Sequence, residues 1–308
     1  MRALLVVNPK ATATTERTRD VIASALAAEV KLDVTTTAHR WHAYELARDA
    51  RVDGFDVVIA FGGDGTVNEV VNGLLSMGPS GAVPALAVVP AGSTNVFARA
   101  LGLPRDAVEA TGEVLDALRC HRRRVIGLGR ADERWFTFCA GMGLDADVVA
   151  AVERRRAAGA SSTAGLYVRT ALRELCSTRE QHRPLLTASC ADGAAVEGLR
   201  LGLVANTSPW TYLGTRPVVP TPRASFDAGL DLFGMRRMRA RTLVRHVGQA
   251  MRAAGGSPRG RHQVAVHDQS SVVLRADRPT ALQVDGDALG FRSEVRFTAV
   301  PRALAVAL

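Results

Sequence analysis

The sequence predicts an α/β domain built on a parallel sheet, followed by an antiparallel β-sandwich. Over residues 1–120, apolar β-branched runs alternate with stretches whose apolar residues recur at helical spacing. After about residue 123, short alternating runs are separated by turns rich in Gly, Asp and Pro. The length of 308 residues also makes two domains the natural expectation.

The first half divides into strands and helices with short connections. Strands are expected at 4–8, 32–36, 56–61 and 85–89, and helices at 16–29, 43–50, 67–75 and 106–118, with a helix or turn at 94–101. Such alternation implies a mostly parallel sheet that binds its ligand at the carboxyl ends of the strands.

The second half is dominated by short strands. They are expected at 123–129, 134–140, 184–190, 199–206, 229–235, 262–267, 271–275, 281–284 and 291–299. Two helical patterns, at 163–175 and 242–253, interrupt them. Both fit amphipathic helices packed on the sandwich, and because each carries arginines, a membrane-facing role is the alternative. Residues 153–163 are interpreted as a mobile loop.

The most informative segment is the turn that follows the third strand, Gly62-Gly63-Asp64-Gly65-Thr66. A strand, a glycine turn and a helix start together present unpaired backbone N–H groups to a phosphate. The segment lacks the lysine of a P-loop and the glycine spacing of a dinucleotide fingerprint. Asp64 would repel phosphate unless a divalent cation or a proton lay between them, which points to metal–nucleotide chemistry. The alternative is a plain glycine turn with Asp64 as a helix N-cap.

Four further segments carry polar groups at turns. Asn8-Pro9-Lys10 follows the first strand and Pro90-Ala91-Gly92-Ser93-Thr94-Asn95 follows the fourth, so both suit a nucleotide. Gly141–Asp145 and Gln283–Asp287 lie in the second half, and the latter places two carboxylates around a glycine. An Asp-Gly-Asp segment is usually only a β-turn, but beside a phosphate loop it offers a general base.

Composition limits the class of protein. Apolar residues make up 47% of the chain, and no run approaches the roughly 18 residues of a membrane span. The four cysteines show no C-x-x-C pairing, so neither a zinc site nor a disulfide framework is indicated, and a reducing cytoplasm is the simplest setting.

The net charge of +9 is almost entirely due to arginine. Arginines cluster at 122–124, at 154–156 and at 236–241. One explanation is a codon bias with solvated charges, and the other is attraction to an anionic membrane surface. Nucleic-acid binding is disfavoured because aromatic residues are few and no reader motif is present.

Three motifs resemble the diacylglycerol kinase catalytic domain family, which includes bacterial soluble lipid kinases and the sphingosine and ceramide kinases. They are Gly62–Glu69 (GGDGTVNE), Pro90–Ala98 (PAGSTNVFA) and Val284–Asp287 (VDGD), in that order along the chain. The first motif is shared with NAD kinases. The resemblance implies an ATP-binding α/β domain at 1–122, rejoined by 296–308, and a lipid-binding β-sandwich at 123–295.

The resemblance also implies roles for individual residues. Asp287 would be the general base, Asp64 would lie near the metal and the acceptor hydroxyl, and Asp145 would be a supporting acid. The nucleotide would be contacted by Asn8, Pro9, Lys10, Thr37, Gly62, Gly63, Asp64, Gly65, Thr66, Asn68, Glu69, Gly92, Ser93 and Asn95. A structural magnesium ion would be held by the Asp227 side chain and the carbonyl groups of Ala224 and Gly229. This sequence departs from the family pattern at Ala11 and Ala228, where glycine is usual.

The activity implied is ATP- and Mg²⁺-dependent phosphorylation of a primary lipid hydroxyl, with diacylglycerol converted to phosphatidic acid. A sphingosine- or ceramide-type kinase, an NAD kinase and a non-enzymatic lipid- or nucleotide-binding protein are the alternatives. The expected setting is the cytoplasm, with peripheral contact to anionic membrane. A homodimer is compatible with the sequence.

Overall fold

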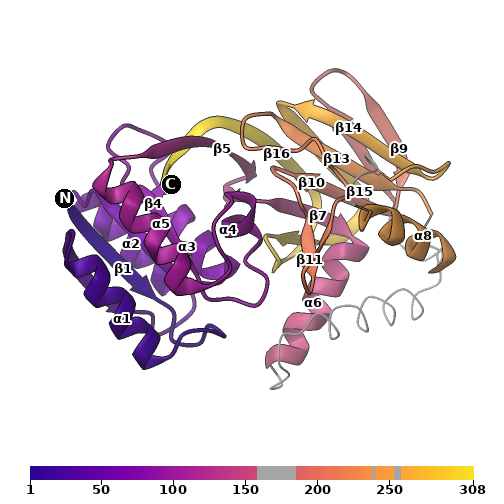
Figure 1. The fold of residues 1–308 in the computed structure, drawn as a ribbon. Helices are drawn as coiled ribbons and strands as arrows, with labels where there is room; N and C mark the ends of the chain where they lie inside the picture. Colours follow the sequence, from indigo (N-terminus) through magenta and orange to yellow (C-terminus); the bar gives the residue numbers. More distant parts are fainter. Residues whose placement is uncertain (158–184, 238–239, 253–257) are drawn as a thin grey trace. The chain divides into compact units, whose positions relative to one another are not determined.

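The computed structural model describes residues 1–157, 185–237, 240–252 and 258–308, and the chain clusters into two compact units (Figure 1). Unit 1 comprises Met1–Gly127 and Arg302–Leu308, and unit 2 comprises Leu128–Pro301. Each unit is described in turn. No helix among the described residues is long and apolar enough to cross a membrane.

Unit 1 contains a parallel sheet in the order β4-β3-β1-β2, with the end of β16 pairing parallel to β4. Every strand and helix predicted for this half is present, with its ends shifted by at most a few residues. The elements are β1 (Arg2–Val7), α1 (Glu16–Ala27), β2 (Lys31–Thr36), α2 (His42–Val52), β3 (Val57–Gly62), α3 (Asp64–Leu74), β4 (Ala85–Pro90), α4 (Val96–Ala100) and α5 (Ala107–Arg119).

The strand order of unit 1 reverses at one point. β1 lies between β2 and β3, so the connections that leave β1 and β3 diverge to opposite faces of the sheet. Helices α1 and α5 pack together on one face, whereas α2 and α3 pack together on the other (Figure 1). In open α/β sheets, ligands bind at such a reversal, outside the carboxyl ends of the strands.

Unit 2 is built from antiparallel strands, as predicted. They are β6 (Arg134–Phe136), β7 (Cys139–Gly143), β8 (Leu186–Cys190), β9 (Ala195–Leu199), β10 (Leu201–Ala205), β11 (Thr211–Leu213), β12 (Arg216–Val218), β13 (Leu230–Met235), β14 (Gln263–Gln269) and β15 (Ser271–Val284). Two longer strands, β5 (Arg123–Ala131) and β16 (Asp287–Ala307), contribute residues to both units.

The strands of unit 2 form two layers joined by β15. Residues 272–276 of β15 pair with β8, and residues 282–284 pair with β7, so this strand passes from one layer to the other. Gly202 and Gly234 face each other across β10 and β13, and an added Cβ at either would meet a leucine of the opposite layer within 2.9 Å. These glycines therefore let the two layers approach closely around the buried core.

Several details of the second half differ from the predictions. Residues 153–157 end helix α6 (Leu144–Ala157) instead of forming a loop, and the remainder of that predicted loop lies outside the described residues. The predicted strand 134–140 is divided between β6 and β7, whereas 271–275 and 281–284 belong to the single strand β15. Strands β9, β11 and β12 were not predicted.

Helix α6 was missed because it is buried on several sides. Its residues Leu144, Val148 and Val152 recur at helical spacing, but buried Ala146 lies off that stripe, so the contrast between an apolar and a polar face is weak in the sequence. The predicted helix at 242–253 corresponds to α8 (Ala240–Ala250), and Ala253 itself lies outside the described residues. The predicted helix at 163–175 also lies outside them.

Candidate active site

The glycine loop of unit 1 lies at the reversal of strand order. Gly62 ends β3 and Gly63 is the N-cap of α3 in an extended conformation, and the first amides of a helix have no acceptor within that helix. Asn8, at the end of β1, donates its side-chain amide to Thr66 Oγ1 at 2.8 Å and accepts the Lys10 N–H at 3.0 Å. These contacts connect the two loops that flank the reversal.

The loop after β4 packs directly against the glycine loop. An added Cβ at Gly92 would lie 2.7 Å from the Gly63 Cα, so the two backbones are already in contact. Asn95 adopts a left-handed conformation with φ of 50° and exchanges two hydrogen bonds with the Gly92 backbone. The Ala91 N–H donates to the Gly62 carbonyl at 2.8 Å. The two motifs thus form one rigid structure.

Asp64 is the first residue of α3, but its carboxylate is not the cap of that helix. Its two oxygens accept the Val96 and Phe97 N–H groups at 3.0 and 3.1 Å, which are the first amides of α4. Asp64 therefore joins the two loops. The alternative in which it is a plain N-cap of α3 does not describe this geometry.

A magnesium ion bound with nucleotide fits the groups at this loop. Mg²⁺ is commonly held by one or two carboxylates together with substrate phosphates and water. Asp64 supplies carboxylate oxygens in the same turn as the glycine amides. Asp64 would hold such an ion, and the ion would neutralise phosphate charge.

Gly65 is the position of the loop that faces open space. An added Cβ would meet no atom within 4 Å, whereas a Cβ at Gly62 would lie 2.5 Å from Thr66 Oγ1. Packing within the fold therefore explains Gly62 but not Gly65. A phosphate against the α3 amides would need the space beside Gly65 to remain free.

The Gly65→Ala variant is expected to keep its thermal stability and to bind nucleotide weakly. Alanine is a better helix former than glycine by up to about 1 kcal/mol, so the fold should not suffer. Isothermal titration with MgATP and a melting curve measure the two effects. Gly112→Ala is the matched control, since Gly112 is also helical and also faces open space. A Gly65→Ala protein with unchanged MgATP affinity would contradict the phosphate role.

The other nucleotide residues predicted in unit 1 also lie at this edge of the sheet. Thr37 follows β2, and its N–H donates to the Val7 carbonyl at 2.8 Å. Glu69 of α3 accepts the Trp41 N–H at 3.0 Å, and Asn68 is fully buried beside Asn72, whose side chain donates to it. Pro9, Lys10 and Ser93 are exposed. The structure brings these residues together, and their contacts with nucleotide stay a prediction.

In unit 2, the Asp-Gly-Asp segment is a tight hairpin between β15 and β16. Asp285 and Gly286 both have positive φ, at 48° and 83°, as a type I′ turn requires, and Val284 pairs with Asp287. The Gly286 N–H donates to Gln283 Oε1 at 3.0 Å. This turn fixes Asp287 as the first residue of β16.

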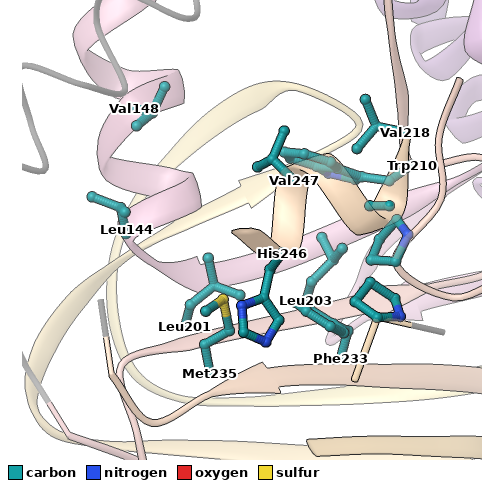
Figure 2. Close-up of a pocket in the computed structure, with 13 residues that line it drawn as sticks. Leu144, Val148, Leu201, Leu203, Trp210, Val218, Phe233, Met235, His246 and Val247 are labelled. Carbon is teal, nitrogen blue, oxygen red and sulfur yellow. The ribbon is translucent and has the colours of Figure 1, made fainter. Parts of the chain in front are cut away.

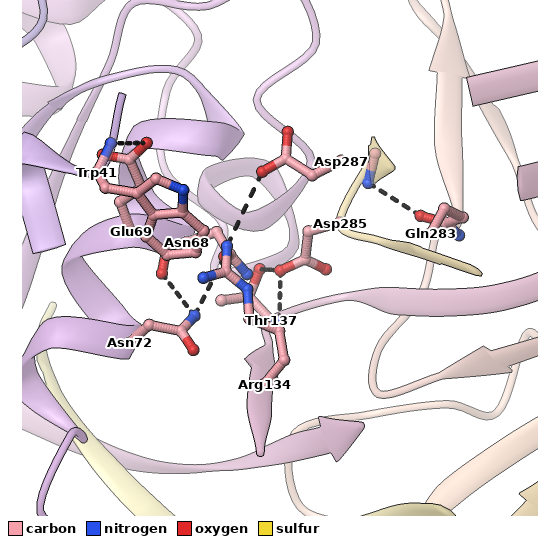
Figure 3. A network of polar contacts seen from close by, with 10 residues as sticks. Trp41, Asn68, Glu69, Asn72, Arg134, Thr137, Gln283, Asp285 and Asp287 are labelled. Carbon is pink, nitrogen blue, oxygen red and sulfur yellow. Dashed lines mark hydrogen bonds and ion pairs between the residues drawn. The ribbon is translucent and has the colours of Figure 1, made fainter. Parts of the chain in front are cut away.

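The Asp285 carboxylate is buried and accepts four hydrogen bonds. Oδ2 accepts the Thr137 N–H and hydroxyl at 2.7 and 2.8 Å (Figure 3). Oδ1 accepts the Phe138 and Cys139 N–H groups at 3.0 and 3.1 Å. Burial raises the pKa of Asp285, while these four donors oppose the rise. Asp285 therefore anchors the turn to the segment between β6 and β7.

Asp287 lies at the surface of unit 2 beside a cation. Its Oδ2 is 3.9 Å from Arg134 of β6, and its side chain is 26% exposed (Figure 3). Asp287 is thus paired with a guanidinium, and its role as the general base stays a prediction.

The remaining predicted residues of unit 2 are more scattered. Asp145 is the second residue of α6. Asp227 is exposed in the turn before β13, and the Gly229 N–H donates to Asp268 Oδ1 at 2.7 Å. The magnesium site at Asp227, Ala224 and Gly229 stays a prediction.

One group of three potential metal ligands exists among the described residues, in unit 1. His39, His42 and Glu45 bring ligand atoms within 4.8 Å of one another. However, His42 Nδ1 accepts the Ala38 N–H at 3.0 Å, so its Nε2 carries the proton in the neutral ring. We therefore assign no metal to this group.

An apolar pocket lies on the outer face of the β10–β13 layer of unit 2. The space between its lining residues, counted together with the part that opens to solvent, is about 760 Å³. Leu203 and Phe233 form its floor and α6 and α8 contribute its walls, as Figure 2 shows. The lining residues are Leu144, Val148, Leu201, Leu203, Trp210, Val218, Pro220, Phe233, Met235, His246, Val247, Ala250 and Pro258.

His246 is the only ionisable side chain among the described residues that line this pocket. It is 5% exposed, and its Nδ1 lies 2.7 Å from the Thr242 carbonyl of the same helix. The sequence did not reveal the pocket, because its lining residues come from segments that are far apart along the chain. It also gave no indication of Arg134 or Thr137, which are distant in sequence from the turn that they contact.

The arrangement defines a class of fold: an α/β unit with a glycine loop after its third strand, and an antiparallel sandwich. A putative diacylglycerol kinase from Bacillus anthracis str. Sterne matches it with a TM-score of 0.78, at 22% identity over 99% of this chain and 96% of that one. An NAD kinase from Archaeoglobus fulgidus, solved in complex with ATP, matches with a TM-score of 0.52, at 11% identity over 100% and 94%. Both likenesses concern the fold.

Sequence comparison is more specific. Residues 2–130 match the model of the diacylglycerol kinase catalytic domain. The diacylglycerol kinase of Bacillus subtilis (strain 168) is 45% identical over 98 residues, which are 32% of this chain and 30% of that protein. A probable lipid kinase YegS-like protein of Chromohalobacter salexigens is 36% identical over 166 residues, 53% and 51% of the two chains. The matched segments thus span about half or less of these relatives.

Proposed function

We propose that this protein transfers the γ-phosphoryl group of ATP to the primary hydroxyl of a lipid, with diacylglycerol as the leading acceptor and phosphatidic acid as the product. The observation that carries the proposal is the presence, in one chain, of a glycine loop at the strand reversal and an apolar pocket. The loop suits the nucleotide, and the pocket suits a hydrocarbon chain. An NAD kinase would need a polar pocket for its acceptor, and the pocket of unit 2 is apolar.

Phosphoryl transfer depends mainly on positioning and charge neutralisation, because its transition state is loose. The amides at the start of α3 would hold the phosphates, and Asp64 would bind the Mg²⁺ that accompanies them. Asp287 would accept the hydroxyl proton as the lipid oxygen attacks phosphorus. Arg134 and the Asp285 turn would orient Asp287 for this step.

Peripheral binding to an anionic membrane is part of the proposal. Arg122–Arg124, Arg154, Arg236 and Arg237 are exposed, and each basic residue near an anionic surface contributes about 1 kcal/mol. Binding to vesicles containing phosphatidylglycerol should therefore fall as salt rises. Salt-independent binding would favour the codon-bias explanation of the net charge.

The direct test is a panel of acceptors presented in mixed micelles with MgATP labelled in its γ-phosphate. We expect label in the product of diacylglycerol, and no label in NAD. If label appeared only in sphingosine or ceramide, the lipid kinase activity would be supported and the proposed acceptor would be wrong. Label only in NAD, or in no acceptor while ATP still binds, would overturn the proposal in favour of an NAD kinase or a binding protein.

The pocket can be tested by filling it. Ala250→Phe places a larger side chain among the pocket residues of α8, so the KM for long-chain acceptors is expected to rise about tenfold or more, while short-chain acceptors are still phosphorylated. Overpacking costs about 1–3 kcal/mol, which a melting curve would show. Val244→Phe is the control, because Val244 lies on the exposed face of the same helix. If the KM for long-chain acceptors were equal in Ala250→Phe and Val244→Phe, the pocket would not be the acceptor site.

A further inference from the structure

Trp41 adopts a backbone conformation that bulky side chains rarely occupy. Its φ is 71° and its ψ is 0°, in the left-handed region, and it directly precedes α2. A residue with a Cβ is strained there, and Asn, Asp and Gly are the usual occupants. Strained residues of this kind concentrate at ligand sites, where the surrounding structure holds them in place.

Specific contacts hold Trp41 in this conformation. Its N–H donates to Glu69 Oε1 at 3.0 Å, as Figure 3 shows, and Glu69 lies one turn of α3 beyond Gly65. The indole meets the Tyr44 ring edge-on, with centroids 6.0 Å apart. The indole is only partly exposed. The strain is therefore maintained by the helix that also carries the phosphate loop.

The position of Trp41 relative to the phosphate loop suits a nucleoside. The connection that carries Trp41 leaves the carboxyl end of β2, and the glycine loop leaves the carboxyl end of β3, two strands away. Two strand spacings correspond to roughly 10 Å along the edge of the sheet. A nucleotide whose phosphates lie at the α3 amides can reach the β2 end with its base.

We propose that the Trp41 indole covers one face of the base of the bound nucleotide. The inference rests on the proposed function and deepens it, because it assigns the base, as distinct from the phosphates, to the β2 end of the sheet. An indole stacks on any base, since every base has a π face. Trp41 therefore contributes affinity for ATP and GTP alike, and discrimination between them comes from other groups.

The test separates the base from the phosphates. Trp41→Asn keeps a residue that tolerates the left-handed conformation and removes the aromatic face. We expect the Kd of MgATP, measured by isothermal titration, to rise by roughly 5- to 150-fold, the range that one stacked base contributes. The Kd of magnesium tripolyphosphate, which has no base, should stay unchanged. Trp41→Phe should recover much of the MgATP affinity.

His121→Asn is the matched control. His121 is also a left-handed residue of unit 1, with φ of 51°, but it is exposed at the end of α5. The control should bind both ligands as the wild type does. Equal MgATP affinity in Trp41→Asn and wild type would overturn the inference and leave the kinase proposal standing. A wild-type protein that binds neither ligand would instead contradict the kinase proposal itself.

Discussion

The Asp287→Asn variant is expected to lose about 10²- to 10⁴-fold in turnover, the usual contribution of a general base. Asparagine has nearly the shape of aspartate but cannot accept the proton of the attacking hydroxyl. The affinity for MgATP should change little, because Asp287 belongs to unit 2 and the phosphate loop to unit 1. The measurements are kcat with a micellar lipid acceptor and Kd for MgATP.

Asp287→Glu is the companion variant, since it keeps a carboxylate on a longer arm. It should retain more activity than Asp287→Asn, although a displaced carboxylate is less well aligned. If Asp287→Asn kept its activity within a few-fold of the wild type, the base would have to be another group.

The second large effect is on stability. Asp285→Asn should destabilise unit 2 by about 3–5 kcal/mol, because its amide group would face two of the donors that now reach a carboxylate oxygen. The Thr137 hydroxyl can reverse its role, but a backbone N–H cannot. A decrease of roughly 6–20 °C in the melting temperature is expected for a unit of this size.

Asp287→Asn also serves as the stability control. Asp287 is two residues away, partly exposed and paired with Arg134, so its replacement should cost no more than about 1 kcal/mol. The two variants are expected to separate cleanly, with catalysis lost in one and stability lost in the other. An Asp285→Asn protein that melts with the wild type would show that the four hydrogen bonds are not what holds the turn.

The fold was predictable from the sequence where local pattern and tertiary environment agree. In unit 1, the strands are buried apolar runs, and helices such as α5 bury one stripe of apolar residues. The spacing of apolar residues in the sequence therefore predicts each strand and helix. The glycine loop was also predictable, because Gly62–Thr66 stands between a strand and a helix. The antiparallel character of unit 2 followed from alternation and turn residues.

The remaining features depend on contacts between distant segments. The sequence around Asp64 cannot reveal that its carboxylate accepts the amides of α4, 32 and 33 residues later. The role of Asp285 depends on its hydrogen bonds with Thr137–Cys139. The pocket forms where α6 and α8 cover the outer face of β10 and β13, and these elements are far apart in the sequence. Trp41 has no sequence signal for its left-handed conformation, because that position usually favours a small or polar residue.

The contact between Gly63 and Gly92 affects how mutational data on this protein should be interpreted. A Cβ added at Gly92 would lie 2.7 Å from the Gly63 Cα, so a side chain introduced there would displace the opposite loop. Loss of function at Gly92 would consequently not prove that Gly92 meets a substrate. In a saturation screen, substitutions at Gly92 and at Gly63 should both be poorly tolerated, and changing both glycines together should give no relief.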